Sequence, residues 1–213
     1  IGNNITSIGD YAFYHCSSLT SVTIGNGVTE IGGCAFVGCS SLTSVTIPDG
    51  VTSIGEYAFR GCTSLTSITI SDSVTAIGDK AFEHCSSLTS VTIPDSITSI
   101  EYKVFYGCSS LTSINIPDSV TSIGESAFRD CSSLTSVTIS NGVTSIVSSA
   151  FRDCSSLKEV YCKPVTPPSG DSNMFGGNAS GRKIYVPTES VEAYKTASYW
   201  SGYADAIYGY DFE

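Results

Sequence analysis

Apolar and polar positions follow a pattern that repeats every 23 residues along most of this 213-residue chain. Within one period, Leu65, Ile68 and Ile70 are apolar, with Thr69 between the last two, which predicts a short strand with its apolar side buried. Residues 71–73 form a predicted turn, and residues 74–77 form a second short extended segment that Gly78 ends. Residues 79–85 then predict one helical turn or slightly more. Each period is therefore expected to form one coil.

The apolar positions form columns when the periods are aligned. Each repeated cysteine has a phenylalanine three residues before it and a leucine three residues after it. A single coil cannot bury these side chains, but stacked coils can, with neighbouring strands ~4.8 Å apart. A period of this length is typical of leucine-rich solenoids. The prediction is an α/β repeat solenoid with a parallel β-sheet on one face and short helical turns on the other. The repeated cysteines are Cys16, Cys39, Cys62, Cys85, Cys108, Cys131 and Cys154.

The repeat unit C-x-S-L-T-S-V-T-I-P-D-S-V-T-S-I-G-x-x-A-F resembles the BspA-like leucine-rich repeat, also called the Treponema pallidum type, over residues 1–162. The resemblance implies a surface-exposed or secreted protein, as in gut Bacteroidetes or Firmicutes, that serves adhesion or host-protein binding without a defined ligand. The chain departs from its own consensus at four positions. Glu101 and Val147 replace a glycine, Val104 replaces an alanine, and Cys34 replaces a polar residue.

The period ends after residue 162, and a proline-rich exit follows at residues 163–170. Residues 183–187 predict a last strand, and Thr188 or Ser190 can cap a helix that runs towards Trp200. Solenoid ends expose an apolar section that needs a cap. We therefore expect seven repeats over residues 1–162, the first one truncated, and a capping segment of strand plus helix over residues 163–213. Aromatic residues of this segment are Tyr194, Tyr199, Trp200, Tyr203 and Tyr208.

Charge excludes two classes of partner. The chain has 10 Lys and Arg against 20 Asp and Glu, a formal net charge of −10, so it lacks the basic clusters that bind nucleic acid or anionic membranes. It has no run of 18 apolar residues that would predict a membrane span. Ile1 aligns with Ile24 at the end of a strand, so we expect a mature product or excised fragment whose upstream repeats or anchor have been removed. A secreted or cell-surface monomer is the expectation.

The cysteine column suggests disulfide or metal chemistry, and its geometry argues against both. Nine cysteines in an extracellular chain are typical of a disulfide framework. A bridge needs Cβ atoms ~3.8 Å apart, closer than adjacent coils allow, so buried free thiols are predicted, with Cys34 exposed. The pairs at 15–16 and 84–85 lie three coils apart, too far to share a zinc ion.

A column of aspartates marks the corner after each first strand. Stacked carboxylates ~5 Å apart could hold a calcium ion between them. The alternative, which we favour, is that each aspartate accepts a hydrogen bond from the backbone of its own turn. The column consists of Asp49, Asp72, Asp95 and Asp118.

The turns opposite the sheet vary most between repeats, and we call their side chains the ridge. Tyrosine and arginine are enriched at protein interfaces, so the ridge, or the edge of the sheet, is the predicted binding site. Nearby acids such as Glu56, Asp130 and Asp153 could instead simply pair with the arginines. The Ser and Thr face of the sheet lacks aromatic anchors. The candidate ridge residues are Tyr11, Tyr14, Tyr57, Arg60, Tyr102, Tyr106, Arg129 and Arg152.

No catalytic constellation is predicted. The chain has only two histidines, far apart in the repeat, and no glycine-rich phosphate loop, so neither Ser-His nor Cys-His catalysis is expected. Three classes remain: an adhesion module that binds an extracellular protein, a carbohydrate-binding module that uses Tyr and Trp of the tail, and a structural stalk that displays another domain. Neither a cofactor nor a metal is predicted.

Overall fold

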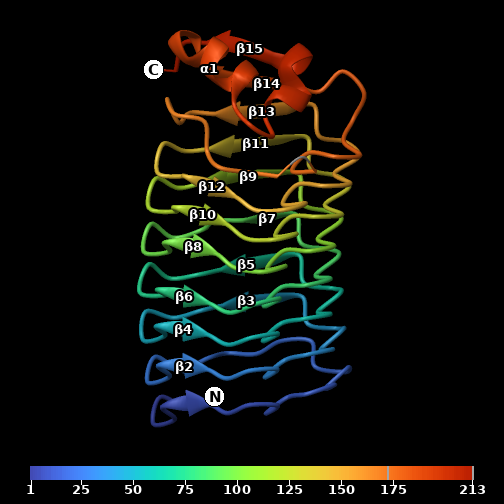
Figure 1. Ribbon diagram of the computed structural model, residues 1–213. Coiled ribbons are helices and arrows are strands. Elements are labelled where there is room, and N and C mark those ends of the chain that lie inside the picture. Colours follow the sequence, from blue (N-terminus) through green and yellow to red (C-terminus); the bar gives the residue numbers. More distant parts are fainter. Residues whose placement is uncertain (172, 213) are drawn as a thin grey trace.

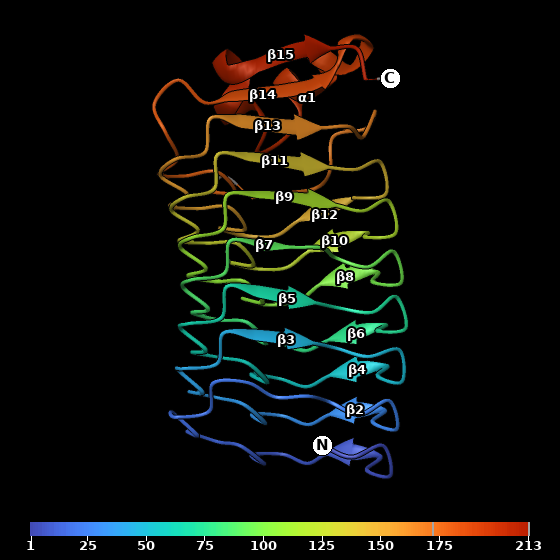
Figure 2. The same ribbon diagram turned by 180° about the vertical axis from the view of Figure 1, so that it is seen from behind.

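The first strands of successive coils form a parallel row along one face of the molecule (Figure 2). The computed structural model describes residues 1–171 and 173–212, so Ser172 and Glu213 of the predicted capping segment lie outside the described residues. Equivalent positions pair in register, as Ser44 does with Ser67, because every coil has the same length. The row consists of β3 (Ser44–Thr46), β5 (Ser67–Thr69), β7 (Ser90–Val91), β9 (Ser113–Ile116), β11 (Ser136–Ile139), β13 (Glu159–Cys162), β14 (Lys183–Pro187) and β15 (Ile207–Tyr210).

A second row of two-residue strands faces the viewer in Figure 1. These strands are the second extended segments predicted from the repeat, and they too pair in parallel register. In each, the isoleucine is buried and the residue before it is more exposed, as alternation along a strand requires. They are β1 (Ser7–Ile8), β2 (Glu30–Ile31), β4 (Ser53–Ile54), β6 (Ala76–Ile77), β8 (Ser99–Ile100), β10 (Ser122–Ile123) and β12 (Ser145–Ile146).

The prediction of helical turns along the ridge is wrong. These segments are tight turns that form hydrogen bonds to the next coil. Lys80 and His84 have φ of 56° and 59°, in the left-handed region, so the N–H groups of successive residues in this turn point in alternating directions. The N–H groups of Lys80, Phe82 and His84 donate to carbonyls of the following coil, whereas those between them bond back within their own coil. A helix would keep all of these N–H groups inside one coil. Among the described residues, helices occur only in the C-terminal segment.

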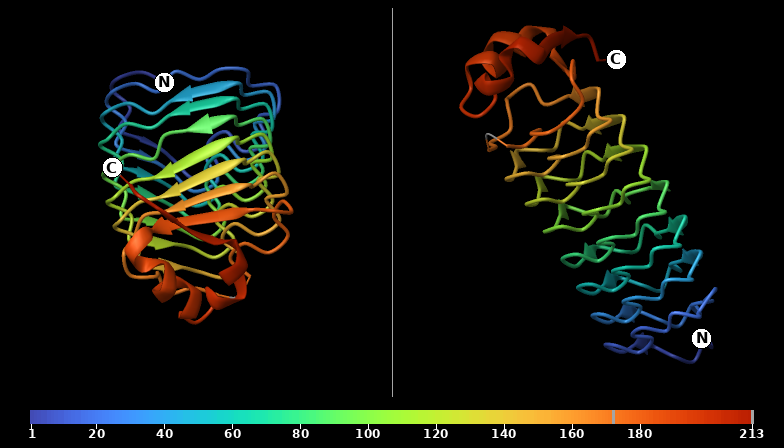
Figure 3. Two further views of the ribbon diagram at one scale, coloured as in Figure 1. Left: turned by 90° about the horizontal axis from the view of Figure 1, so that it is seen from above. Right: turned by 90° about the vertical axis from the view of Figure 1, so that its right-hand side faces the viewer.

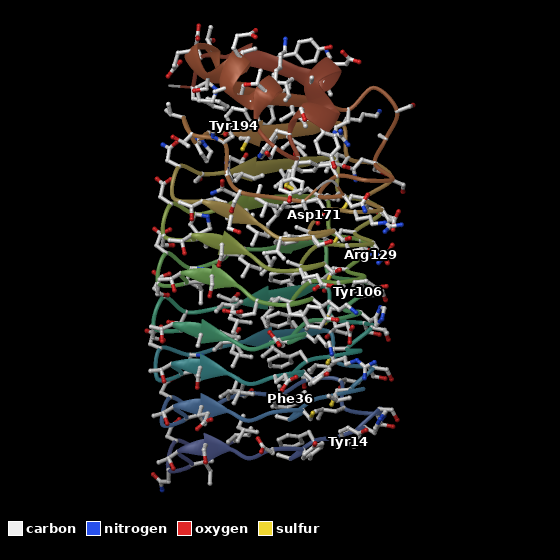
Figure 4. All side chains as sticks on the ribbon, in the orientation of Figure 1. Tyr14, Phe36, Tyr106, Arg129, Asp171 and Tyr194 are labelled. Atoms are coloured by element: carbon white, nitrogen blue, oxygen red, sulfur yellow. The ribbon has the colours of Figure 1, made fainter. Side chains whose placement is uncertain are left out.

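The core consists of the predicted columns. Phe36, Phe59 and Phe82 are fully buried, and their rings stack at 5.1 and 5.5 Å between centroids with planes within 5° of parallel. The stack runs from Phe13 to Phe175, beyond the last repeat. Parallel stacking follows from the constant coil length, which places each ring over its equivalent. Figure 4 shows Phe36 inside the stack of coils.

The predicted burial of the thiol column is confirmed, and all nine cysteines are free. In each inner coil the thiol donates to a phenylalanine carbonyl of the preceding coil, as Cys85 does to Phe59 at 3.2 Å. Cys16, in the first coil, is exposed. The expectation of an exposed Cys34 is wrong: it is half-buried beside Tyr11, a contact that raises the pKa of the tyrosine hydroxyl.

The C-terminal segment closes the upper end of the stack in the right-hand view of Figure 3. β14 has the predicted bounds, but β15 follows it as a further strand. The predicted helix is shorter than expected: it comprises a 3-10 turn, η1 (Thr188–Ser190), and α1 (Val191–Thr196), and it has no side-chain cap. A second 3-10 helix, η2 (Ser201–Ala206), leads to β15. Tyr194 and Trp200 are fully buried and donate hydrogen bonds to the carbonyls of Pro164 and Pro168, respectively. These two bonds hold the proline-rich exit against the C-terminal segment.

Candidate functional site

The middle of the ridge is a row of interleaved tyrosine and lysine side chains. The Lys80 ammonium lies 4.6 Å from the ring centre of Tyr57 and 5.1 Å from that of Tyr102. Lys103 lies 5.0 Å from Tyr102 and 5.1 Å from Tyr106. Cation–π contacts of this kind hold a surface side chain in place. Five residues from three coils therefore form one ordered strip, and three of them are predicted site residues.

Hydrogen bonds add to the order of this strip, which we call the Tyr–Lys strip. Lys80 Nζ donates to Tyr57 Oη at 2.6 Å, and that bond raises the pKa of the ammonium. Tyr106 bonds to Asp130, which raises the pKa of the tyrosine hydroxyl. All five side chains of the strip are partly exposed. The strip is thus accessible and carries two ammonium groups, with the carboxylates of Glu83 and Asp130 beside it.

The three predicted arginines of the ridge are all paired with acids. Arg60 Nε lies 2.5 Å from a carboxylate oxygen of Glu83 in the next coil. Arg129 and Arg152 both lie 3.3 Å from Asp153, which joins two coils. The alternative role for Asp130 and Asp153 as ion-pair partners is therefore present in the structure, whereas Arg60 pairs with Glu83 and not with Glu56. Paired arginines offer fewer free donors to a partner.

Tyr11 and Tyr14 lie at the other end of the ridge, away from the Tyr–Lys strip. They are 61% and 48% exposed, and their rings meet edge to face at 5.5 Å. Figure 4 shows Tyr14, Tyr106 and Arg129 along the same edge of the molecule. The structure therefore places the eight predicted residues on one side but divides them into a tyrosine pair, the three tyrosines of the Tyr–Lys strip, Arg60 with its partner Glu83, and a group in which Arg129 and Arg152 pair with aspartates.

The aspartate corner does not form a cluster of ligands. All four carboxylates are exposed. Asp49 accepts a hydrogen bond from Ser71 Oγ of the following coil, and Asp118 accepts one from the Asn141 N–H of the following coil. We predicted that each aspartate would accept a hydrogen bond from its own turn, but these bonds run between coils. Within residues 1–171 and 173–212, no three His, Cys, Asp or Glu side chains are grouped so that they could hold a metal ion.

The sheet face carries an aromatic cluster that sequence analysis missed. The outward position occupied by threonine in earlier coils becomes Tyr161 in β13, Tyr185 in β14 and Tyr208 in β15. Tyr161 and Tyr185 stack at 5.0 Å, and Tyr210 meets both rings at 5.6 Å. Aligning residues 157–162 with the repeat could have revealed Tyr161, because it falls in the threonine column.

A groove of about 650 Å³ lies beside this cluster. Its floor is the outward side of β9, β11 and β13, and its wall is the chain that follows β15. Ligand sites usually have volumes of about 300–1,000 Å³. The groove is lined by Asn115, Thr138, Tyr161, Lys163, Tyr210, Asp211 and Phe212.

The tail aromatics invoked for sugar binding are divided between core and surface. Tyr194 and Trp200 are fully buried and meet edge to face at 4.8 Å, so neither can contact a ligand. That part of the carbohydrate hypothesis is wrong, because the two large rings fill the end of the solenoid core. Tyr199 and Tyr208 remain exposed.

Comparison with known proteins supports the resemblance of the repeat. A family model described as a BspA type leucine rich repeat region, in six copies, matches residues 1–111 and 75–201. The chain belongs to this family. A crystal structure of a leucine-rich repeat protein from T. pallidum is 34% identical, with a TM-score of 0.69, and the match covers 78% of each chain. One from Bacteroides ovatus is 28% identical, with a TM-score of 0.60, over 85% of this chain and 59% of that chain. A search of curated proteins found no match.

Membership of the BspA-type family confirms the predicted fold class. Proteins of the BspA type are generally non-enzymatic scaffolds for protein interaction, and they typically lie at the cell surface or are secreted. In the part of this BspA-type chain that the structure describes, helices are six residues long at most, and none could cross a membrane.

Proposed function

We propose that this chain is a non-catalytic extracellular module, secreted or held at the cell surface, that binds a host or bacterial protein through its ridge. The observation that carries the proposal is the Tyr–Lys strip, in which Tyr57, Lys80, Tyr102, Lys103 and Tyr106 hold one another at 4.6 to 5.1 Å. Residues 1–162 present this strip on a rigid frame, and residues 163–213 serve as a cap.

Two physical arguments favour a protein partner for the strip. Aromatic side chains are enriched at protein interfaces, and a strip that is already ordered loses less side-chain entropy on binding. The two ammonium groups, Lys80 and Lys103, supply positive charge on the strip of a chain whose net charge is −10. An acidic or tyrosine-rich protein surface would complement it. Arg129 lies near Tyr106 at the border of the strip, and Arg129 and Arg152 are paired with the acids Asp130 and Asp153.

The test is an array of purified extracellular matrix proteins and bacterial surface proteins, probed with the whole chain. A hit is then measured by surface plasmon resonance against a triple variant, Tyr57→Ala with Lys80→Ala and Tyr106→Ala. We expect this variant to lose at least tenfold in affinity. The matched control, Thr46→Ala with Thr69→Ala and Thr92→Ala, changes the sheet face and should bind within twofold of the original protein.

Three outcomes separate the candidate functions. Equal loss in both triple variants, or none in either, would remove the ridge site. Loss only in the sheet-face variant would move the protein site to that face. The absence of any hit on the array would favour the stalk, which displays another domain without binding. Melting curves of both variants show that the comparison is made on folded protein.

A further inference from the structure

The groove on the sheet face, between β9 and the chain after β15, has the chemistry of a small-ligand site. We propose that it binds a neutral oligosaccharide, with Tyr161, Tyr210 and Phe212 as its aromatic wall. This site goes beyond the proposed protein-binding function, because it lies on a different face from the Tyr–Lys strip and shares no residue with it.

The aromatic wall is built from two distant parts of the chain. Tyr161 belongs to β13, while Tyr210 ends β15, and their rings meet edge to face at 5.6 Å and 75°. Phe212 lies 4.9 Å from Tyr210 at 51°. The rings are thus set at angles to one another and form a concave corner. The C–H faces of a sugar ring pack against aromatic rings, which bury apolar surface without a charged contact.

The floor of the groove supplies uncharged hydrogen-bonding groups. Asn115 and Thr138 point outward from adjacent coils, in register with Tyr161. An amide can donate and accept, and a hydroxyl can do both, which matches the hydroxyl groups of a sugar. The spacing of the coils, ~4.8 Å, is close to the length of one unit in an extended hexose chain. The register of the sheet therefore repeats at the period of the proposed ligand.

The charges of the groove select against anionic ligands. It contains one cation, Lys163, and one carboxylate, Asp211, so there is no cluster of positive charge to hold a phosphate or an acidic sugar. Asp211 Oδ1 accepts a 2.6 Å hydrogen bond from Thr188 Oγ1, and the Lys163 ammonium lies 5.9 Å from the Phe212 ring. The net charge of −10 also repels acidic polymers. A neutral, polyhydroxylated chain fits this balance.

The test is affinity electrophoresis of the whole chain through gels that contain starch, xylan, galactomannan or mixed-linkage β-glucan. We expect at least one polysaccharide to slow the protein, and calorimetry with the matching hexasaccharide to give a measurable Kd. Tyr161→Ala and Tyr210→Ala should each weaken this binding at least tenfold. Tyr14→Ala changes a ridge tyrosine about as exposed as Tyr210, so it is the matched control and should bind as before.

Structural damage is separated from loss of contact by a second pair of variants. Tyr161→Phe keeps the ring stack of β13 and should retain most of the affinity, and melting curves show whether each alanine variant is folded. No retardation by any of the four polysaccharides would overturn the proposal, as would retardation that Tyr161→Ala and Tyr210→Ala leave unchanged. Because the ridge triple variant keeps the groove, failure here is distinguishable from failure of the protein-binding proposal.

Discussion

The imidazole of His84 occupies the space that a side chain at Gly107 would need. A β-carbon built on Gly107 would lie 2.5 Å from His84 Nδ1, and Gly107 has φ of 70°. Gly61 is the equivalent residue of another coil, also with φ of 70°, but a β-carbon there would approach only backbone atoms of Gly38, at 3.8 Å and beyond. Two glycines of one column thus differ in a single neighbour.

This difference predicts unequal costs of the same substitution. Gly61→Ala should destabilise by about 1–2 kcal/mol, the cost of a left-handed backbone with a β-carbon. Gly107→Ala should cost about 1 kcal/mol more, because the β-carbon also displaces His84 from Tyr106. In a His84→Ala background the extra cost should vanish. Urea denaturation followed by circular dichroism measures the cycle, and an equal cost of Gly107→Ala in both backgrounds would refute the steric explanation.

The phenylalanine column should be far more sensitive in its middle than at its end. Phe82 is fully buried between Phe59 and Phe105, each 5.5 Å away, so Phe82→Ala should cost about 3–5 kcal/mol. Phe13→Ala removes the same ring from a half-buried site with one stacking neighbour, and should cost less than half as much. Chemical denaturation of the two variants provides the comparison. Similar losses would show that the stack does not couple the coils.

The period of 23 residues is sufficient to predict the columns, because equal coils place equivalent side chains one above another. Cys85, Leu88 and Phe82 are buried as alignment of the repeats requires. Residues 183–187 also form the expected strand, since apolar alternation marks it without help from the repeat. The buried positions and strands that follow from the pattern of one coil, repeated at constant length, could therefore be predicted from the sequence.

Features that depend on contact between coils were not accessible in this way. Residues 79–85 have the composition of a helical turn, and only donation to the next coil decides between that and the observed turn. Likewise, the groove requires Tyr210 to return beside Tyr161, across some fifty residues of chain, through the pairing of β15 with β14. The pairing of Arg60 with Glu83 in place of Glu56 has the same origin.

That ion pair leads to a prediction about buried charge. The Glu83 side chain is only 8% exposed, whereas that of Arg60 is 47% exposed. Arg60→Ala should destabilise by about 1–2 kcal/mol, because it leaves a nearly buried carboxylate without its cation. Adding Glu83→Gln should restore most of the loss, since a neutral amide has no charge to leave unpaired. Thermal melts of the single and double variants test this, and a double variant no more stable than Arg60→Ala would contradict it.

Because of the buried thiols, the free energy of unfolding should fall as the pH rises into the alkaline range. Burial raises the pKa of Cys85 to about 12, and that of Cys162 to about 12 as well, whereas an unfolded thiol titrates near pH ~8.5. A raised folded pKa means that the unfolded chain releases its proton first. The contribution to stability is therefore complete below pH ~8.5 and is lost as the pH rises towards about 12.

Each buried thiol should reduce the free energy of unfolding by about 1.4 kcal/mol per pH unit in this window. We expect Cys85→Ala to lower stability at pH 7 but to show a slope shallower by that amount between about pH 9.5 and about pH 11. Cys16→Ala, which changes an exposed thiol of the same column, should keep the original slope. Urea unfolding at a series of pH values gives these slopes. If Cys85→Ala and Cys16→Ala gave the same slope, the thiol column would not be the source of the pH dependence.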